Sequence, residues 1–352
     1  MGIRRLNNFL ENNDLLKYHN NIGDFIKSFK INGYKFFNTR NNHFVIGIDL
    51  MLYAHKYEYS CESLYPGFLN QILNFLSNQI IPIYIIDGTA PIEKNRVIKL
   101  RNIRKDKINK KMEILKKKLE EKSLNINEKN KIIKQINKLN KSCINISPDH
   151  INNLIKMFNI FNIPYIRANG EADNLIATLF NKNIINACLS EDMDILVFGC
   201  KKMIKFKSNM IIEYDLEFIL ENLKINHDKF IELCILFGCD YLKPILRDKP
   251  DKIYEKFIKC ENFIDLFNEI ELKLEIIDNY INDFNKTKLI FKNLTNEKLP
   301  NTKTSMKIID YNLLNDFFKK ICNYNFNNNI KYQISHINHL IKNNKFSKIN
   351  IY

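Results

Sequence analysis

Three apolar segments of this chain each end in an aspartate, and this repeated pattern constrains the fold more than any other feature. The segments are HFVIGID, which closes on Asp49, IIPIYIID, which closes on Asp87, and NIINACLSED, which reaches Asp192. Each is short, rich in Ile or Val and bounded by polar residues, as expected of strands buried on both faces of a parallel sheet. Helix-period segments such as GFLNQILNFLSNQ and PDHINNLIKMFNIF lie between them. The order strand, helix, strand predicts an α/β fold with right-handed crossovers.

The same pattern predicts that acidic side chains meet at one edge of the sheet. Ligands of open α/β sheets bind outside the carboxyl ends of the strands, where the three aspartates are expected. The segment NGEADNLIATLF adds Glu171 and Asp173 in the first turn of a helix. The buried helix in FIELCILFGCDY stops near Gly238 and presents Asp240.

Seven carboxylates are therefore candidates for one site. They are Asp49, Asp87, Glu171, Asp173, Asp192, Asp194 and Asp240. Two unit charges about 4 Å apart repel by about 4 kcal/mol at an effective dielectric constant of 20, so such a cluster requires bound cations. Oxygen ligands without His or Cys favour Mg²⁺ or Mn²⁺ over zinc. Two such ions can hydrolyse a phosphodiester. Any one of these acids alone is more often a helix cap or a solvated strand end.

The charge of the chain points to an anionic polymer as its partner. The formal net charge is +15 and the isoelectric point is about 9.2. Residues 94–141 contain 18 Lys/Arg and 5 Asp/Glu, so a net +13 lies in this one segment. Such a segment favours nucleic acid or a charged membrane surface as the partner. Next to the acidic cluster, it indicates hydrolysis of a nucleic-acid backbone.

The basic segment is predicted to form a long helical hairpin that projects from the active edge of the sheet. Apolar residues recur in it at helical spacing, and NINE is a possible turn. These apolar residues are Met112, Leu115, Leu119, Ile132, Ile133 and Ile136. A solvated surface coiled coil is the alternative for this hairpin. From about residue 241 onward the chain is expected to be helical, without further strands.

Several other classes of protein and site are disfavoured. The eight cysteines form no CxxC pair, which is typical of reduced thiols in an intracellular protein. A signal peptide and an apolar run of about 18 residues are both lacking, so no segment is expected to span a membrane, and no membrane partner is predicted. The pair His336 and His339 has no third ligand and suits a helix surface. The segment YNLLNDFF has Tyr311 where a sliding-clamp-binding peptide has Gln, and it is interpreted as an internal amphipathic helix.

Beyond these inferences, the chain resembles the XPG-like 5′ nuclease family, which includes flap endonucleases and the exonuclease-one group. The matching motifs are, in order, MGIRRL, VIGIDL, IYIIDG followed by Lys94 and Arg101, the basic insertion, GEAD, EDMDILVFG and LCILFGCDY. The resemblance implies a PIN-like α/β fold whose central, mostly parallel sheet is flanked by helices. It further implies an inserted basic helical arch and a helical C-terminal region.

The resemblance also implies a division of the chain into four parts. Residues 1–93 would form the first part of the nuclease domain, 94–147 the basic arch, 148–241 the second part of the nuclease domain, and 242–352 a DNA-binding C-terminal region. The seven carboxylates would hold two Mg²⁺ ions, with Mn²⁺ as a substitute, and Asp192 and Asp194 would also be catalytic. Lys94 and Arg101, seven residues apart on one helix face, would steer and polarise the scissile phosphate. Without the resemblance, these two are more simply charges on a solvated basic helix.

Further residues are candidates for contacts with nucleic acid. The set is Gly2, His55, Lys94, Arg101, Arg104, Lys105, Lys243 and Arg247. YAHK and FGCKKMI resemble the exonuclease-one branch, in which His55 would stack on a nucleobase, although a lone His is more often an ordinary polar residue.

Two features depart from the family. The last glycine of the chain is Gly238, so the family's glycine-containing hairpin and its potassium site are in doubt, although Lys243, Arg247, Lys249 and Lys252 could still meet phosphates. The segment before Asp49 is also long. Its Tyr34, Phe36 and Phe37 suit core or hairpin packing better than a wedge against the duplex end.

These observations predict a Mg²⁺-dependent, structure-specific 5′ nuclease that acts on DNA with a 5′ flap, a nick or a free 5′ end, as an endonuclease, a 5′ to 3′ exonuclease or both. Replication, repair or recombination would be its setting. The protein is expected to be a monomer in the nucleus or at a cytoplasmic viral or organellar replication site. The alternatives are a non-catalytic PIN-like scaffold that binds nucleic acid and an RNA-directed 5′ nuclease.

Overall fold

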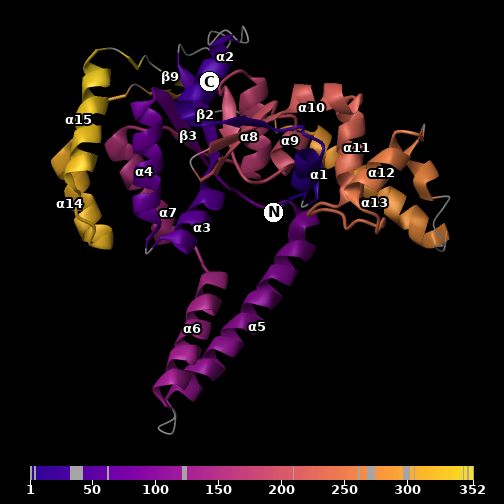
Figure 1. Ribbon diagram of the computed structural model, residues 1–352, viewed down its shortest axis with the longest axis horizontal. Coiled ribbons are helices and arrows are strands. Elements are labelled where there is room, and N and C mark those ends of the chain that lie inside the picture. Colours follow the sequence, from indigo (N-terminus) through magenta and orange to yellow (C-terminus); the bar gives the residue numbers. More distant parts are fainter. Residues whose placement is uncertain are drawn as a thin grey trace.

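A seven-stranded sheet forms the centre of the protein, which is seen here in a computed structural model (Figure 1). The structure describes residues 2–3, 5–31, 43–61, 63–120, 125–208, 210–260, 262–267, 274–295, 302–304, 306–343, 345–346 and 349–351. The described strands are β1 (Lys17–His19), β2 (Phe44–Asp49), β3 (Ile80–Ile86), β4 (Tyr165–Arg167), β5 (Ala187–Leu189), β6 (Lys202–Lys207), β7 (Met210–Asp215), β8 (Thr302–Thr304) and β9 (Ile349–Ile351).

Helices make up most of the rest of the described chain. The α-helices are α1 (Leu6–Asn12), α2 (Ile22–Ile31), α3 (Leu50–Ser60), α4 (Leu64–Ser77), α5 (Asn95–Leu119), α6 (Ile126–Ser142), α7 (Pro148–Phe161), α8 (Ala172–Asn181), α9 (Asp194–Val197), α10 (Leu216–Leu223), α11 (His227–Phe237), α12 (Pro250–Phe257), α13 (Leu274–Lys292), α14 (Tyr311–Cys322) and α15 (Asn328–Lys342). Short 3₁₀ turns are η2 (Ile92–Lys94) and η3 (Phe263–Phe267).

The sheet has the strand order β1-β7-β6-β5-β2-β3-β4 and is mostly parallel. β2 lies at its centre, parallel to both β5 and β3, and every residue of β2 and β3 is buried. The chain has to cross over between such parallel strands, and the helical segments between the apolar runs provide the crossovers. The hairpin β6–β7 and the short β1 extend one side of the sheet in antiparallel pairing. The expected PIN-like α/β fold with a mostly parallel central sheet is confirmed.

Helices cover the sheet where their apolar faces predict burial. α4 packs along β3, and α8 lies against β2 and β3. Ser147 caps α7 by accepting a hydrogen bond from the His150 amide, and the helix covers the predicted residues 148–161. The strand residue Gly47 lets a neighbouring side chain approach closely, since an added Cβ would lie 2.7 Å from Cδ1 of Ile185.

The predicted basic hairpin is formed by α5 and α6, and it projects from the body of the protein (Figure 1). α5 carries no buried residue, whereas Ile132 and Ile136 of α6 are buried against it. Asn125 opens α6 with a capping box that includes Glu128, within the NINE sequence expected to turn. The hairpin is therefore held together by a narrow apolar seam. Its exposed surface is rich in charged side chains but also includes the predicted seam residue Ile133, which is 41% exposed.

Where the structure describes it, the C-terminal region is mainly helical and contains one pair of short strands. α12 and α13 lie on one side of the body, and α14 and α15 lie on the other, where they pack on α7 and α4 (Figure 1). The expectation that no strand follows residue 241 is wrong, because β8 and β9 pair antiparallel. YNLLNDFF begins α14, with Leu314 and Phe318 buried, as an internal amphipathic helix should.

Tyr34, Phe36 and Phe37, considered above for packing or for a wedge, lie outside the described residues. Among the residues that the structure describes, no helix combines the length and the apolar character needed to cross a bilayer.

Candidate metal centre and nucleic-acid interface

Three neighbouring parallel strands deliver the first acids to one edge of the sheet. Asp49 ends β2, Asp87 follows β3 directly, and Asp192 lies three residues beyond β5. Asp49 also caps α3, because its Oδ1 accepts a hydrogen bond from the Leu52 amide (3.1 Å). Asp49 therefore both ends a buried strand and caps the helix that follows it.

Glu171 and Asp173 reach the same edge because the β3 end and the start of α8 are tied together. The Ala172 amide donates to Asp87 Oδ1 (2.8 Å), so Asp87 caps the helix across 85 residues of chain. The Gly88 amide donates to the Gly170 carbonyl (2.8 Å). An added Cβ on Gly88 would lie 2.1 Å from a backbone oxygen, which shows why this turn contains glycine.

Asp192 and Asp194 lie against the N-terminus of the chain. The Asp194 amide donates to Asp192 Oδ1 (3.1 Å). This hydrogen bond orients the Asp192 carboxylate over the start of α9. Gly2 has φ +69°, and a Cβ placed on it would lie 1.9 Å from Asp192 Oδ1 and 2.5 Å from Asp194 Oδ1. Only glycine fits here, so the motif MGIRRL has a structural reason at its second residue.

Asp240 comes from a tight turn after α11. Gly238, at φ +93°, ends the helix, and a Cβ there would lie 2.4 Å from the Pro244 ring. The Cys239 amide donates to the Leu242 carbonyl (3.0 Å) and closes the turn that presents Asp240. The sequence prediction that α11 stops at this glycine is confirmed.

The cluster contains buried oxygen atoms without hydrogen-bond partners. Both carboxylate oxygens of Asp194 and Oδ1 of Asp173 are buried and unpaired, and Asp194 is 0% exposed. Burial, and then the Asp192 charge, raise the pKa of Asp194 and of Asp173 well above the ordinary value. Burial and the charge of Asp87 raise the pKa of Asp49 to about 7. Unpaired buried carboxylate oxygens are suited to bind hard divalent cations.

The seven acids lie near enough to repel one another, although they do not form a compact ligand set. Among the described residues, no group of three or more His, Cys, Asp or Glu side chains is arranged to hold one metal ion. The acids instead bind cations of the chain itself. Lys94 Nζ lies 2.5 Å from Glu171 Oε1, and Arg101 Nη2 lies 2.7 Å from Asp240 Oδ2.

Lys94 and Arg101 both lie where the basic hairpin leaves the body. Lys94 ends η2, its side chain is 14% exposed, and Arg101 is about two turns further along α5. Burial alone would lower the pKa of Lys94, but the Glu171 and Asp194 charges outweigh it and raise that pKa above its ordinary value. The ammonium group therefore stays charged, and the hairpin base brings two cations to the acidic cluster.

The other candidates for nucleic-acid contacts are spread more widely. Burial, and then the charge of Lys105 on α5, lower the pKa of the half-buried His55 on α3. Lys105 is half-buried and Arg104 is exposed on α5. Lys243 and Arg247 are exposed in the loop between α11 and α12.

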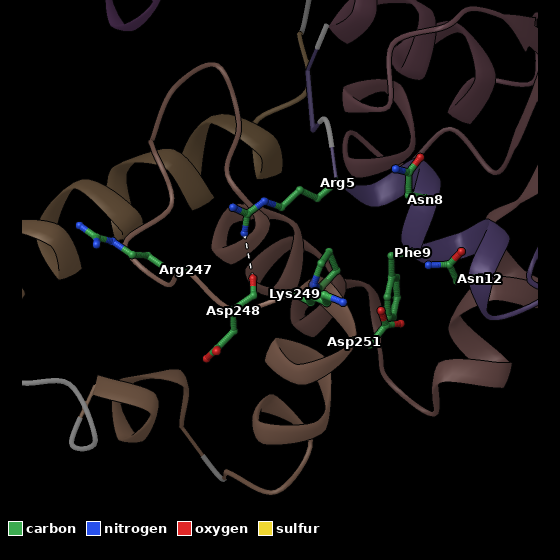
Figure 2. Close-up of a pocket in the computed structure, with 9 residues that line it drawn as sticks. Arg5, Asn8, Phe9, Asn12, Arg247, Asp248, Lys249 and Asp251 are labelled. Carbon is green, nitrogen blue, oxygen red and sulfur yellow. Dashed lines mark hydrogen bonds between the residues drawn. The ribbon is translucent and has the colours of Figure 1, made fainter.

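Arg247 borders a pocket of about 450 Å³ between α1 and the start of α12 (Figure 2). Arg5 crosses this pocket and donates from Nη1 to the Asp248 carbonyl oxygen (3.2 Å), whereas Arg247 extends away from the other cations. Lys249 is exposed and lies at the N-cap of α12. Cationic groups from the start of α1 and from the loop between α11 and α12 thus line one concave surface.

Sequence reasoning did not single out two residues that the structure brings to these sites. The Tyr241 hydroxyl donates to Glu171 Oε2 (2.6 Å). Arg5 belongs to the quoted MGIRRL motif, and Tyr241 to the quoted GCDY motif. Their positions were visible in the motifs, but their partners lie 243 and 70 residues away along the chain.

Comparison with known proteins ties this arrangement to a family. The family described as the XPG I-region matches residues 162–240, the segment that contains Glu171, Asp173, Asp192, Asp194 and Asp240. "Flap endonuclease 1-B" of Sorghum bicolor is 28% identical over 189 residues, and "Flap endonuclease 1" of Drosophila yakuba is 27% identical over 218. The chain is therefore similar to proteins of the XPG/flap endonuclease family.

The matches to curated XPG/flap endonuclease relatives are partial. The Sorghum match covers 51% of this chain and 40% of the relative, and the Drosophila match covers 60% and 51%. The chain spans about half the length of the curated relatives it matches.

Solved structures of the family share the fold over most of the chain. The catalytic core of Rad2 in complex with DNA substrate superposes with a TM-score of 0.59 at 19% identity, covering 89% of this chain and 98% of that one. Flap endonuclease-1 from Methanococcus jannaschii gives 0.59 at 21% identity, with 87% and 94% covered. Human GEN1 in complex with Holliday junction DNA gives 0.60 at 15% identity, with 96% and 77% covered. At these identities the likeness establishes the fold alone.

Proposed function

We propose that this protein is a nuclease of the XPG/flap endonuclease type, which depends on Mg²⁺ and hydrolyses DNA in a structure-specific way at a 5′ flap, a nick or a free 5′ end. The observation that carries the proposal is the position of two hairpin cations, Lys94 and Arg101, on an acidic cluster with unpaired buried oxygens. The relatives named flap endonuclease and the Rad2 structure with DNA substrate support it.

The cluster fits divalent cations in the chemistry of its donors. The seven acids supply carboxylate oxygens, and Oδ1 of Asp173 and both oxygens of Asp194 are buried without a hydrogen-bond partner. Divalent ions held by the seven acids would activate water and stabilise the leaving oxygen of a phosphodiester. The expected ligands are Asp49, Asp87, Glu171, Asp173, Asp192, Asp194 and Asp240.

The remaining steps belong to the chain's own side chains. Lys94 and Arg101 would bind the scissile phosphate at the hairpin base and offset charge that develops on it. Arg104, Lys105 and the outer lysines of α5 and α6 would attract the single-stranded 5′ end through its phosphates.

The pocket of Figure 2 would receive the duplex. Arg5, Arg247 and Lys249 line it. Loss of these cations should weaken DNA binding without changing the cleavage chemistry, because phosphate contacts position a duplex and carry no chemistry of their own.

A panel of end-labelled substrates in Mg²⁺ tests the proposal. The panel contains a 5′ flap, a nicked duplex, a blunt duplex, a gapped duplex and a hybrid with an RNA 5′ segment. Cleavage near the junction of the flap, abolished by EDTA, is expected. Binding of all substrates with cleavage of none would instead support a non-catalytic scaffold, and preference for the RNA-containing hybrid would support an RNA-directed nuclease.

A further inference from the structure

The Glu171 carboxylate is held from both sides by different groups. Lys94 Nζ lies 2.5 Å from Oε1, and the Tyr241 hydroxyl donates to Oε2 at 2.6 Å. Each oxygen of the carboxylate thus has a partner of its own. This distinguishes Glu171 from Asp173 and Asp194, whose buried oxygens include unpaired ones. Two partners on one carboxylate fix the plane of the group as well as its position.

The Tyr241 ring is itself fixed by its neighbours. It meets the Phe291 ring edge to face at 5.4 Å between centroids, and Phe291 in turn lies 5.0 Å from the Phe198 ring. Phe291 is 1% exposed and Phe198 is 3% exposed. Because these contacts are buried, the ring has little freedom to rotate, and its hydroxyl stays directed at Glu171.

The same ring also contacts the cation at the hairpin base. Lys94 Nζ lies 4.9 Å from the Tyr241 ring centroid, within the range of a cation–π interaction. Lys94, Glu171 and Tyr241 therefore contact one another pairwise, although they come from three separate segments of the chain. The turn that begins at Gly238 sets Tyr241 directly after Asp240, so one turn provides both a carboxylate and this contact.

We propose that Tyr241 is a positioning residue: its hydroxyl orients the Glu171 carboxylate for a divalent cation, and its ring holds the Lys94 ammonium group at the hairpin base. This inference rests on the proposed function. Groups that hydrogen-bond to a metal-ligating side chain fix its orientation, and their removal typically weakens metal binding by about 10- to 100-fold. Phenylalanine retains the ring and its packing but has no donor for Glu171. Tyr241→Phe therefore separates the two roles.

Mn²⁺ binding, followed by electron paramagnetic resonance without DNA, tests the hydroxyl. Tyr241→Phe should weaken Mn²⁺ binding by about tenfold. Its cleavage rate should return toward that of the unchanged protein at high Mn²⁺. DNA binding measured in EDTA should stay within about twofold. Tyr254→Phe is the matched control, because the Tyr254 hydroxyl donates to the Leu223 carbonyl (2.9 Å) away from the cluster.

Tyr241→Leu tests the ring. It removes the cation–π contact as well as the hydroxyl, so cleavage should stay below that of Tyr241→Phe even at saturating Mn²⁺. A melting temperature close to that of Tyr241→Phe would show that Tyr241→Leu is folded. Cleavage by the two variants that is equal at saturating Mn²⁺ would overturn the role of the ring.

Two other outcomes separate this inference from the proposed function. If Tyr241→Phe binds Mn²⁺ as the unchanged protein does, while Glu171→Gln binds it more weakly, the hydroxyl does not position Glu171 and the inference falls alone. If the unchanged protein binds no Mn²⁺ and cleaves no flap, the proposed function falls, and the inference falls with it.

Discussion

Asp194 is a residue whose environment opposes the stability of the folded protein. It is fully buried, and its two carboxylate oxygens have no hydrogen-bond partner. Burial of an unpaired carboxylate is costly, and the neighbouring Asp192 increases the cost by repulsion. Such residues persist where function requires them. We therefore expect the cluster to reduce the stability of the metal-free protein.

Replacing Asp192 and Asp194 together by Asn tests this expectation. Cleavage of a 5′ flap in Mg²⁺ should fall by on the order of 10³-fold or more, because the expected metal ligands are removed. DNA binding in EDTA should remain within about twofold. The metal-free variant should melt at a temperature at least about 2 °C higher, since charge repulsion is removed. Asp316→Asn, exposed on α14, is the control. Retained Mg²⁺-dependent cleavage by the double variant would refute the catalytic role.

The sequence predicted residues whose position follows from local structure. Asp49 and Asp87 were found because a strand end fixes where they lie, and Asp240 because Gly238 ends its helix. Tyr241 and Arg5 were missed because their partners are set by tertiary contacts across 70 and 243 residues. A tyrosine hydroxyl or a guanidinium group carries no local signal of which oxygen it will meet after folding.

At the scale of elements, β1, β6 and β7 are joined by a buried group of charges. Lys202 Nζ lies 2.5 Å from Asp215 Oδ2 and 3.3 Å from Glu213 Oε1, and all three residues are at most 5% exposed. Two residues of β1 complete the group: Lys17 Nζ lies 2.6 Å from Asp215 Oδ2, and His19 Nε2 lies 2.7 Å from Glu213 Oε2. These contacts attach the short N-terminal strand to the edge of the sheet.

The pH dependence of stability follows from this group. Burial would raise the pKa of Glu213 and of Asp215, but the hydrogen bonds from His19, Lys17 and Lys202 outweigh it and lower both pKa values. Carboxyl groups with lowered pKa values stabilise the fold above their ordinary values of 4.5 and 3.8, and this contribution is lost as the pH falls below them. Urea unfolding should therefore show stability falling from about pH 5 toward pH 3.

Lys202→Met should test the contribution of Glu213 and Asp215 to the pH dependence of stability more directly. The variant leaves two buried carboxylates without their shared cation, and this should cost about 3–5 kcal/mol of unfolding free energy at pH 7. Its difference from the unchanged protein should shrink toward pH 3, where both carboxyl groups become protonated. Lys201→Met is the matched control, because its half-exposed pair with Glu217 should contribute less than about 1 kcal/mol. Equal losses in both variants would contradict the assignment.

The basic residues of the hairpin α5–α6 predict how DNA binding depends on salt concentration. If its outer lysines bind phosphates, changing Lys116, Lys117 and Lys118 to Gln should reduce the slope of log K against log salt by about one for each phosphate that is no longer neutralised. The measurement is flap binding by fluorescence anisotropy at several salt concentrations in EDTA. Lys319→Gln with Lys320→Gln, in the last turn of α14, is the control. An unchanged slope would mean that the hairpin tip does not meet DNA.

Some elements were predictable and others were not. α7 and the hairpin follow from helical periodicity over 14 or more residues, and β2 and β3 from continuous apolar runs. β8 and β9 were missed because each has three residues, and they pair across 44 residues of intervening chain. Strands this short carry too little pattern to be recognised before their partners are known.

At the scale of the whole molecule, negative charge at the edge of the sheet meets positive charge at the base of the hairpin. A basic segment with a net charge of +13 joins the body beside seven carboxylates, and Lys94 and Arg101 bridge the two. A divalent cation that binds only the folded protein should raise its stability by mass action, by about 2.7 kcal/mol at 100 times its dissociation constant. Melting of the unchanged protein should therefore shift upward with Mg²⁺, whereas the Asp192→Asn, Asp194→Asn variant should shift far less.

The central claim is that acids far apart in the chain form one centre for divalent cations. Crystals grown with Mn²⁺ and measured at the manganese absorption edge test it most directly, because anomalous scattering locates each ion. We predict two peaks among the carboxylate oxygens of the cluster, which include those of Asp49, Asp87, Asp192 and Asp194. Peaks found only elsewhere on the protein, or none at saturating Mn²⁺, would contradict the account.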